Sequence, residues 1–211
     1  MRILIVANGS PPSARLLETL RAQADLTIAT DGAAEVLRSL GSGADVVMGD
    51  FDSLSSEILE QMDPSILKPA PDQNASDLEK AVVWALQRGA QTVTITGATG
   101  RRLDHTLTNM SILVKYAGEP IRIVEDWGDA RAVVGEATVE GTPGDTLSLI
   151  LFAPAKGVTL TGVRWALDGE SLSPGSRGVS NEFTEPAARI RVAQGTLLAL
   201  HLHRVTGDGR S

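Results

Sequence analysis

The chain has 211 residues, 42% of them hydrophobic, a net charge of −7 and no cysteine. This content is ample for packed cores, while the lack of cysteine excludes disulfides, thiolate metal sites and cysteine nucleophiles and fits a reducing, cytoplasmic location. Acids and bases are interspersed without a basic stripe, and no apolar run is long enough to span a bilayer. We therefore expect no nucleic-acid partner and no membrane partner.

In the first half of the chain, short apolar runs alternate with helical patterns. Strands are expected at 2–8, 26–30, 45–49, 66–70, 92–98 and 121–126, and helices at 13–22, 32–40, 55–62, 76–88 and 104–116. Strands that are apolar throughout, rather than at every second residue, are typical of a parallel sheet covered by helices on both faces. We predict a mostly parallel α/β/α domain over residues 1–127.

Beyond Asp129 the helical periodicity stops and short strand-like segments follow one another between Gly, Pro and Asp turns. These segments cover 130–141, 145–153, 157–167, 188–193 and 196–203. The pattern predicts an antiparallel β-sandwich over residues 128–211. His201 and His203 share one face of the last segment, and we expect that face to be exposed.

Acidic residues follow several of the predicted parallel strands, at the edge where ligands bind in open α/β sheets. Asp31 follows 26–30, Asp50 and Asp52 follow 45–49, and Asp72 and Asp77 follow 66–70. A single Asp in such a position is commonly a helix cap or a turn residue. Capping does not explain the Asp50-x-Asp52 pair, whose charges repel by about 3 kcal/mol at a separation of about 5 Å.

A bound cation accounts for such a concentration of carboxylates. Mg²⁺ prefers oxygen ligands and usually takes one or two carboxylates together with substrate phosphates. We therefore expect Mg²⁺ at Asp50, Asp52 and Asp77.

The segment TVTITGATGRRLDH, residues 92–105, provides groups that attract phosphate. Gly97 and Gly100 permit close backbone approach at the start of a helix, where amides and the helix dipole attract anions. Arg101 and Arg102 can clamp phosphate oxygens. The segment has neither the spacing of a Walker A loop nor that of a dinucleotide fingerprint. Opposite an acidic rim, it indicates a nucleotide-phosphate site.

Taken together, these motifs resemble those of the thiamine pyrophosphokinase family. They are DGAA at 31–34, GDFDSLS at 49–55, DQNASDLEKA at 72–81 and GATGRRLDHTLTN at 97–109, with GVRWAL at 162–167 and GVSNEF at 178–183 in the second half. The resemblance implies a homodimer that transfers diphosphate from ATP to the hydroxyethyl group of thiamine with Mg²⁺. The first domain would bind ATP and Mg²⁺, and the second would bind thiamine and form the dimer.

The same resemblance implies roles for individual residues. Four acids would form the metal and catalytic cluster, namely Asp31, Asp50, Asp52 and Asp77. The ATP site would include Gly32, Asp72, Gln73, Lys80, Gly97, Gly100, Arg101, Arg102, Asp104 and His105. Thiamine would meet Trp165, Ser180 and Asn181.

Two positions depart from the usual pattern of the family, in which Arg101 and Ala33 are both glycine. The Arg101 side chain either obstructs a phosphate or adds a contact to it. Two other residues have an alternative reading. Lys80 follows Asp77 by three residues, which suits a solvated ion pair as well as phosphate binding, and His105 suits helix capping or packing as well as nucleotide contact.

Two other functions fit part of the sequence. One is diphosphate transfer to another small alcohol, such as a hydroxymethylpterin, and the other is a non-catalytic nucleotide or thiamine sensor. The SNEF segment at 180–183 speaks against the first, and the full set of acids speaks against the second.

Overall fold

The computed structural model describes residues 1–51, 54–72 and 74–204. The chain forms two compact units: residues 1–112 with 120–126, and residues 113–119 with the chain from Trp127 onward. No helix in these described ranges is long and apolar enough to cross a membrane.

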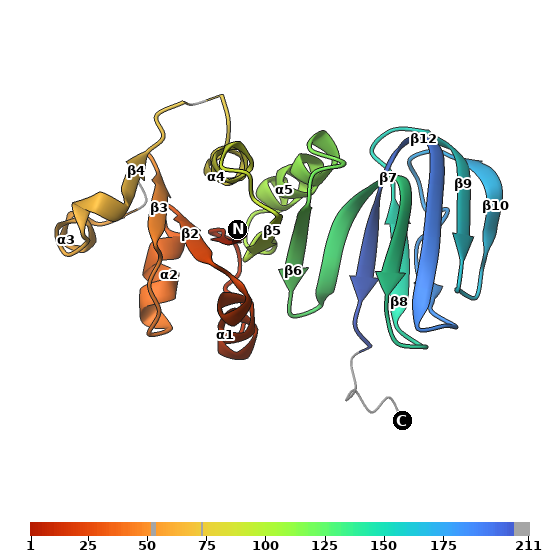
Figure 1. Cartoon of the computed structure of the whole chain (residues 1–211), viewed down its shortest axis with the longest axis horizontal. Helices are drawn as coiled ribbons and strands as arrows, with labels where there is room; N and C mark the ends of the chain where they lie inside the picture. The colour runs from red at the N-terminus through yellow and green to blue at the C-terminus, as the bar shows by residue number, and fades with distance from the viewer. Residues whose placement is uncertain (52–53, 73, 205–211) are drawn as a thin grey trace. The chain divides into compact units, whose positions relative to one another are not determined.

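The first unit contains a six-stranded parallel sheet in the order β6-β5-β1-β2-β3-β4 (Figure 1). Its strands are β1 (Arg2–Val6), β2 (Leu26–Thr30), β3 (Val46–Gly49), β4 (Leu67–Pro69), β5 (Thr92–Thr96) and β6 (Ile121–Glu125). Most are apolar at successive residues because both faces of the sheet are covered. The predicted parallel α/β class is confirmed.

Helices connect these strands: α1 (Ala14–Gln23), α2 (Ala33–Ser39), α3 (Ser56–Glu60), a 3₁₀ turn η1 (Pro64–Ile66), α4 (Asp77–Gln87) and α5 (Leu103–Lys115). Leu17 and Leu20 of α1 and Leu37 of α2 pack with Leu4 and Val6 on one face of the sheet. The helices α4 and α5 lie on the other face (Figure 1).

The order of the strands fixes where a ligand can bind. From β1 the chain builds outward through β2, β3 and β4, and then returns to place β5 on the other side of β1. The loops after β1 and β5 therefore lie where the winding reverses, at the carboxyl ends of the strands. This is the position at which open α/β sheets bind ligands.

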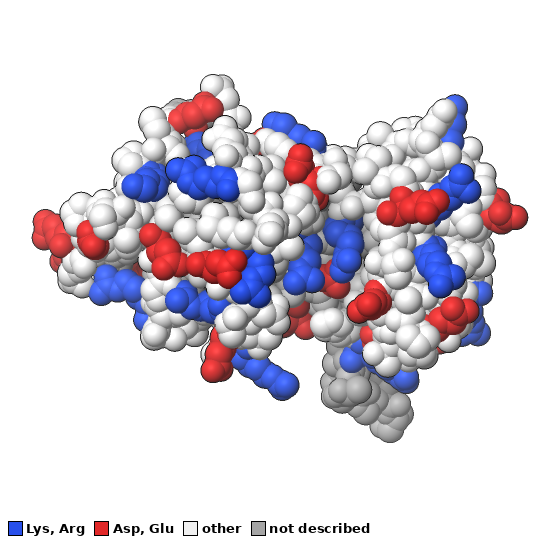
Figure 2. Space-filling view, in the orientation of Figure 1, with Lys and Arg blue, Asp and Glu red and all other residues white. Residues whose placement is uncertain are grey.

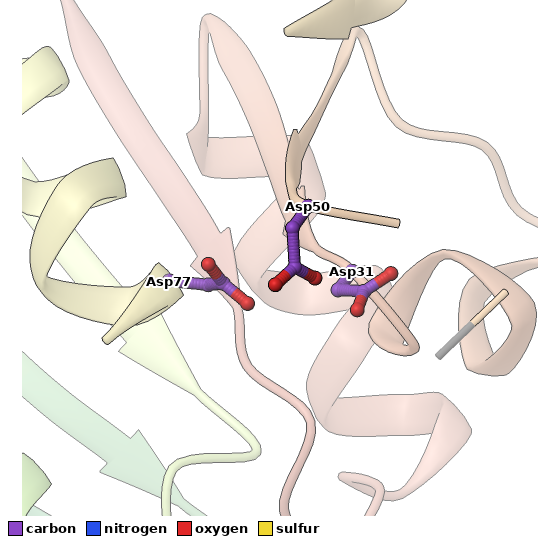
Figure 3. Close-up of side chains that lie close together, drawn as sticks. All are labelled: Asp31, Asp50 and Asp77. Atoms are coloured by element: carbon purple, nitrogen blue, oxygen red, sulfur yellow. The ribbon is translucent and has the colours of Figure 1, made fainter. Parts of the chain in front are cut away.

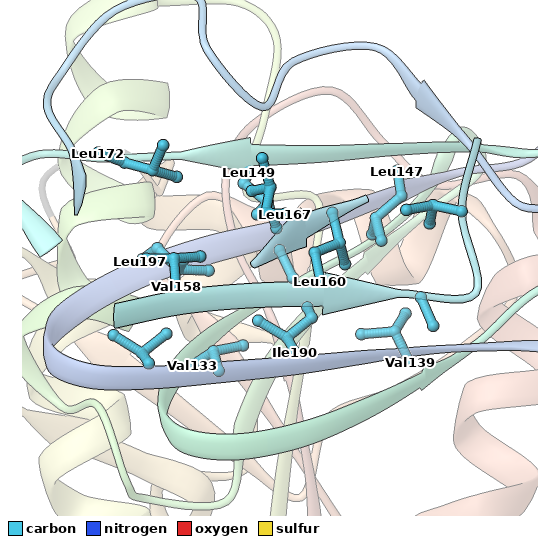
Figure 4. Close-up of a cluster of buried hydrophobic side chains, with 14 of the residues drawn as sticks. Val133, Val139, Leu147, Leu149, Val158, Leu160, Leu167, Leu172, Ile190 and Leu197 are labelled. Carbon is cyan, nitrogen blue, oxygen red and sulfur yellow. The ribbon is translucent and has the colours of Figure 1, made fainter. Parts of the chain in front are cut away.

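The second unit is built from antiparallel strands, as predicted. They are β7 (Gly128–Glu140), β8 (Thr146–Ile150), β9 (Ala155–Thr161), β10 (Leu167–Leu172), β11 (Asn181–Glu182) and β12 (Ala187–Leu202). Along one edge β12 pairs with β7; along the other its first half pairs with β9 and its second half with β8. This change of partner closes a core of buried aliphatic side chains (Figure 4).

Three details of the second unit differ from the sequence prediction. The segments 188–193 and 196–203 form one strand, β12, with an irregularity between Val192 and Leu197. Gly195 lies there with φ 97°, a conformation that glycine adopts readily, so the turn signal marks a bend within a strand. The predicted strand 157–167 ends at Thr161 in β9, and β10 and β11 were not predicted.

Candidate active site

A cavity of about 620 Å³ lies at the carboxyl ends of the first-unit strands, and we call it the acidic cavity. The loops after β1, β2, β3 and β5 and the first turns of α4 and α5 form it. Its described lining includes Asn8, Asp31, Asp50, Asp77, Lys80, Arg101, Arg102, His105 and Asn109.

Asp31, Asp50 and Asp77, which we call the acidic cluster, lie together in this cavity (Figure 3). One carboxylate oxygen from each lies within 4.8 Å of the others. Asp31 is 4% exposed, Asp77 is half-buried and Asp50 is exposed. Asp52, predicted as a fourth member, and Gln73 lie outside the described residues.

The backbone directs each carboxylate toward the others. Asp31 follows β2 with φ 22°, a conformation that L residues rarely adopt. Gly49 precedes Asp50, and a Cβ at Gly49 would lie 2.9 Å from the Asp31 Cβ. Asp77 begins α4, where the Ser76 hydroxyl caps the helix by accepting the Glu79 N–H at 3.3 Å. The ends of β2 and β3 and the start of α4 thus bring three negatively charged carboxylates close together.

Three cations line the same cavity. Lys80 contacts Asp77 at 3.0 Å and donates to the Ala70 carbonyl at 2.7 Å. The expected ion pair therefore exists, but it is partly buried rather than solvated. Arg102 binds Asp104 through two hydrogen bonds of 2.6 and 3.1 Å, and this guanidinium lowers the pKa of the Asp104 carboxyl to about 2. Arg101 donates to the Asn8 Oδ1 at 2.9 Å.

Other predicted nucleotide residues have different surroundings. Among the described residues, Gly32, Asp72, Gly97 and Asp104 do not line the acidic cavity, whereas Gly100 and His105 do. Asp72 is exposed, and hydrogen bonds from the backbone N–H and side chain of Asn74 lower the pKa of its carboxyl. Gly32 admits the Asn8 side chain, since a Cβ there would lie 2.5 Å from its Nδ2.

The backbone amides of the 97–99 loop bind an internal anion. The N–H groups of Gly97, Ala98 and Thr99 donate to the buried Glu125 carboxylate at 3.1, 2.8 and 3.2 Å. Burial raises the pKa of Glu125, against the effect of these hydrogen bonds. These three amides, expected to bind phosphate, are thus already occupied by Glu125. The cationic side chains Lys80, Arg101 and Arg102 line the cavity instead.

Two asparagines that were not predicted as site residues, Asn8 and Asn109, also line the acidic cavity. Asn8 follows β1, and Asn109 is 8% exposed and donates to the Ala98 carbonyl at 2.7 Å. A polar residue directly after β1 was the available signal for Asn8. The signal for Asn109 was its place in the motif 97–109. The signal for Glu125 was its position at the end of β6, since Asp31 and Asp50 also lie at the ends of strands.

A second cavity, of about 270 Å³, lies within the second unit and brings together all three predicted thiamine residues, Trp165, Ser180 and Asn181. Trp165 is 53% exposed. Asn181 is buried; its Oδ1 accepts the Trp165 N–H at 3.0 Å, and its Nδ2 donates to the Trp165 carbonyl at 2.7 Å. Asn181 therefore fixes the backbone that carries an exposed aromatic surface.

The expectation that His201 is exposed is wrong. His201 is 7% exposed, with its Nε2 2.9 Å from Asp145 and its Nδ1 3.4 Å from Asp129. Asp129 and Asp145 are far from His201 in sequence, and the pairing of β12 with β7 and β8 brings all three together. His203 is exposed and lies edge-on to His201, with ring centroids 5.0 Å apart.

The acidic cavity therefore contains carboxylates at one point and cationic side chains around it. Carboxylates can hold a hard cation or accept a proton, and guanidinium and ammonium groups can bind phosphate oxygens. The second cavity has an aromatic face beside polar backbone, which suits a flat heteroaromatic ligand.

Comparison with known proteins covers both units. Residues 17–124 match the family model "Thiamin pyrophosphokinase, catalytic domain", and residues 136–197 match "Thiamin pyrophosphokinase, vitamin B1 binding domain". Thiamine pyrophosphokinase of Bacillus subtilis is 26% identical over 95% of this chain and 98% of its own length. Thiamine pyrophosphokinase 1 of Oryza sativa is 27% identical over 69% of this chain, which spans 61% of that relative.

A solved structure resembles the whole chain. The crystal structure of a thiamin pyrophosphokinase from Geobacillus thermodenitrificans superposes with a TM-score of 0.84 at 28% identity, and the match covers 98% of this chain and 99% of that one.

Proposed function

The chain belongs to the thiamin pyrophosphokinase family, and from that premise we propose that it transfers a diphosphate from ATP to the hydroxyethyl group of thiamine, releasing AMP. The observation that carries this proposal is the convergence of Asp31, Asp50 and Asp77 in a cavity that three cations also line. Neither a plain ion-pair network nor helix capping requires three carboxylate oxygens within 4.8 Å of one another.

The acidic cluster fits Mg²⁺ by its chemistry, because it offers carboxylate oxygens and no nitrogen or sulfur ligands. We propose Asp50 and Asp77 as ligands in the described part of the chain. The sequence motif adds Asp52, which lies outside the described residues, as a third ligand. When bound, the ion would offset the negative charge of the phosphate groups.

The reaction requires the thiamine hydroxyl oxygen to attack the β-phosphorus in line with the bond to the leaving oxygen. A bond forms between these two atoms, the bond from the β-phosphorus to its bridging oxygen breaks, and AMP leaves with that oxygen. The hydroxyl proton passes to a carboxylate of the acidic cluster. No covalent enzyme intermediate is needed, so catalysis depends on positioning and charge.

The cations and the second unit supply binding and orientation. We assign phosphate contact to Arg102, Arg101 and Lys80, and nucleotide contact to His105 and Gly100, all of which line the acidic cavity. The contribution of Gly32, Asp72, Gln73, Gly97 and Asp104 to the ATP site is also part of the proposal.

Trp165 would stack on a thiamine ring, with Ser180 and Asn181 at its edge. The first unit would thus be the ATP- and Mg²⁺-binding domain, and the second the thiamine-binding and dimerisation domain. By likeness to the family we propose a homodimer, and from the lack of cysteine we propose a cytoplasmic location.

A coupled assay for AMP tests the proposal. Purified protein is incubated with ATP and Mg²⁺, with thiamine or with a hydroxymethylpterin, and thiamine diphosphate is identified by mass. We expect AMP only when ATP, Mg²⁺ and thiamine are all present. AMP formed with the pterin in place of thiamine, or tight ligand binding without any AMP, would overturn the assignment.

A further inference from the structure

We propose that Arg101, aimed by Asn8, binds the nucleotide polyphosphate and thereby adds a contact that a glycine at this position cannot make. This inference rests on the proposed function and extends it, because it assigns a positioning role to Asn8, which no motif identified.

The charges around the acidic cavity distinguish Arg101 from the other two cations. Lys80 is paired with Asp77, and Arg102 is paired with Asp104. Arg101 instead donates to the neutral side-chain amide of Asn8. Within the described part of the chain, no carboxylate forms a salt bridge with it. Among the three cations of the acidic cavity, Arg101 is therefore the one that forms no ion pair with a described carboxylate, and its charge is available to an anionic ligand.

Asn8 occupies a position that connects this cation to the acidic cluster. Its Oδ1 accepts the Arg101 Nη1–H at 2.9 Å, while its side chain packs so closely on Gly32 that a Cβ there would lie 2.5 Å from its Nδ2. Gly32 directly follows Asp31. Asn8 thus holds the guanidinium beside the loop that carries the most buried carboxylate of the acidic cluster.

The backbone holds the two loops in register for this contact. Gly9 and Ser10 donate to the carbonyls of Gly97 and Thr99, both at 2.7 Å, so the loop after β1 runs along the loop after β5. Arg101 has φ 51°, in the left-handed region that favours glycine. Arg101 thus adopts a backbone conformation that disfavours a side chain, and from it the guanidinium donates to Asn8 of the neighbouring loop.

A guanidinium has five N–H donors arranged in a planar fork. Asn8 takes one in this structure, and others can meet phosphate oxygens with the bidentate geometry that arginine favours. Of the two outcomes left open by the sequence, obstruction and added contact, we therefore propose the added contact.

The test is a double-mutant cycle in which isothermal titration calorimetry measures the affinity for α,β-methylene ATP in the presence of Mg²⁺. The proteins compared are wild type, Arg101→Gly, Arg101→Ala, Asn8→Ala and the double variant Asn8→Ala/Arg101→Gly. Both Arg101 variants should bind the analogue about tenfold more weakly, the size expected for one charge-assisted hydrogen bond. Their affinity should also depend less on salt, because one phosphate contact is lost.

Asn8→Ala should weaken binding in the wild-type background but have no further effect in the Arg101→Gly background. A merely structural role for Asn8 would weaken binding equally in both backgrounds. Arg15→Ala, which removes an exposed arginine of α1 outside the acidic cavity, is the charge-matched control and should bind like wild type.

The outcomes separate this inference from the proposed function. If wild type forms AMP from ATP and thiamine while Arg101→Gly and Arg101→Ala bind the analogue as tightly as wild type, the role of Arg101 is overturned and the function stands. If wild type forms no AMP with thiamine but the Arg101 variants lose affinity, the function is overturned and the role of Arg101 is supported.

Discussion

The three carboxylates of the acidic cluster differ in exposure, and this difference bears on what each can do. Asp31 is buried, whereas Asp50 is open to solvent at the end of β3. Like charges at this distance destabilise the fold unless a cation offsets them. The cluster is therefore expected to be strained in the absence of metal and stabilised in its presence.

Asp50→Asn should lower turnover at least 100-fold and leave the fold intact. Without divalent cation the variant should be at least as stable as wild type, because one of the mutually repelling charges is removed. Mg²⁺ should raise the melting temperature of wild type but not that of the variant. Turnover and melting temperature with and without Mg²⁺ check this. The control variant Glu18→Gln, at an exposed position of α1, should match wild type in both measurements. Near-normal turnover in Asp50→Asn would contradict a role for Asp50 in the site.

The left-handed backbone of Arg101 makes a separate prediction about stability. Arg101→Gly should be more stable than Arg101→Ala by about 1 kcal/mol, because a Cβ is disfavoured at φ 51° and glycine is not. Urea denaturation of the two variants measures the difference. Equal stability would mean that this conformation stores no strain.

Asn181 offers a third prediction at the residue scale. Asn181→Ala removes the buried amide that holds both backbone groups of Trp165, so the variant should lose about 2 kcal/mol of unfolding free energy. It should also raise the KM for thiamine without raising the KM for ATP. A loss of stability with both KM values unchanged would separate Trp165 from thiamine binding.

At the scale of the elements, the loop between β5 and α5 owes its conformation to β6, a strand that the sequence did not connect with the site. Glu125, at the end of β6, accepts the N–H groups of Gly97, Ala98 and Thr99. The loop that leads to Arg101 and Arg102 is thus folded around a buried acid rather than shaped by its ligand.

Glu125→Gln should disturb this loop, because an amide group accepts through one atom only and its NH₂ faces backbone donors. We expect about 2 kcal/mol less stability and a raised KM for ATP with the KM for thiamine unchanged. Steady-state kinetics and urea denaturation check this, with exposed Glu119→Gln as control. An unchanged KM for ATP would show that the loop does not need its acid.

Asp129 at the start of β7 and Asp145 just before β8 contact the buried His201 near the end of β12. Hydrogen bonding to Asp129 and Asp145 raises the pKa of His201. Burial opposes ionisation of both acids, but hydrogen bonds lower the pKa of each. Asp129 is bound by His201 and Arg131. Asp145 is bound by His201 and the Arg204 N–H. The stabilisation from protonated His201 is therefore fully present below its unfolded pKa of about 6.5 and is lost as pH rises through its folded pKa.

Urea denaturation at pH 6 and pH 8.5 measures this effect. The stability difference between wild type and His201→Gln should be larger at pH 6. Exposed His203→Gln should differ from wild type by the same small amount at both values. A His201→Gln difference that does not change with pH would contradict a charged His201.

The elements predicted best from sequence are those whose pattern is local. All six parallel strands and the five helices were recognisable, because each strand is a short apolar run and each helix has its own periodicity. The continuity of β12 was not, because Gly195 gives the same signal in a bend as in a turn. The burial of His201 and the position of Glu125 follow from pairing between strands far apart in sequence, which no local pattern contains.

In the candidate site too, the features that follow from local sequence patterns were predicted, and those that depend on contacts between distant segments were not. The convergence of Asp31, Asp50 and Asp77 followed from the rule that parallel strands end at one edge. The Asn8–Arg101 contact could not be predicted, because it depends on the close approach that Gly32 permits and on an arginine in a backbone conformation unusual for it.

Taken as a whole molecule, the chain is acidic and its proposed co-substrate is an anion. On the face shown in Figure 2, acidic and basic side chains are interspersed, without a broad region of one sign. Attraction of a nucleotide therefore has to come from local groups: the cations of the acidic cavity and the metal that its carboxylates would hold.

The most direct measurement is a crystal structure of the protein with Mn²⁺ and α,β-methylene ATP, with manganese located by its anomalous scattering. We predict a manganese peak bound by carboxylate oxygens of the acidic cluster, Asp50 among them, with the polyphosphate between that ion and Arg101. A well-ordered nucleotide whose metal lies away from Asp31, Asp50 and Asp77 would contradict the assignment of the site.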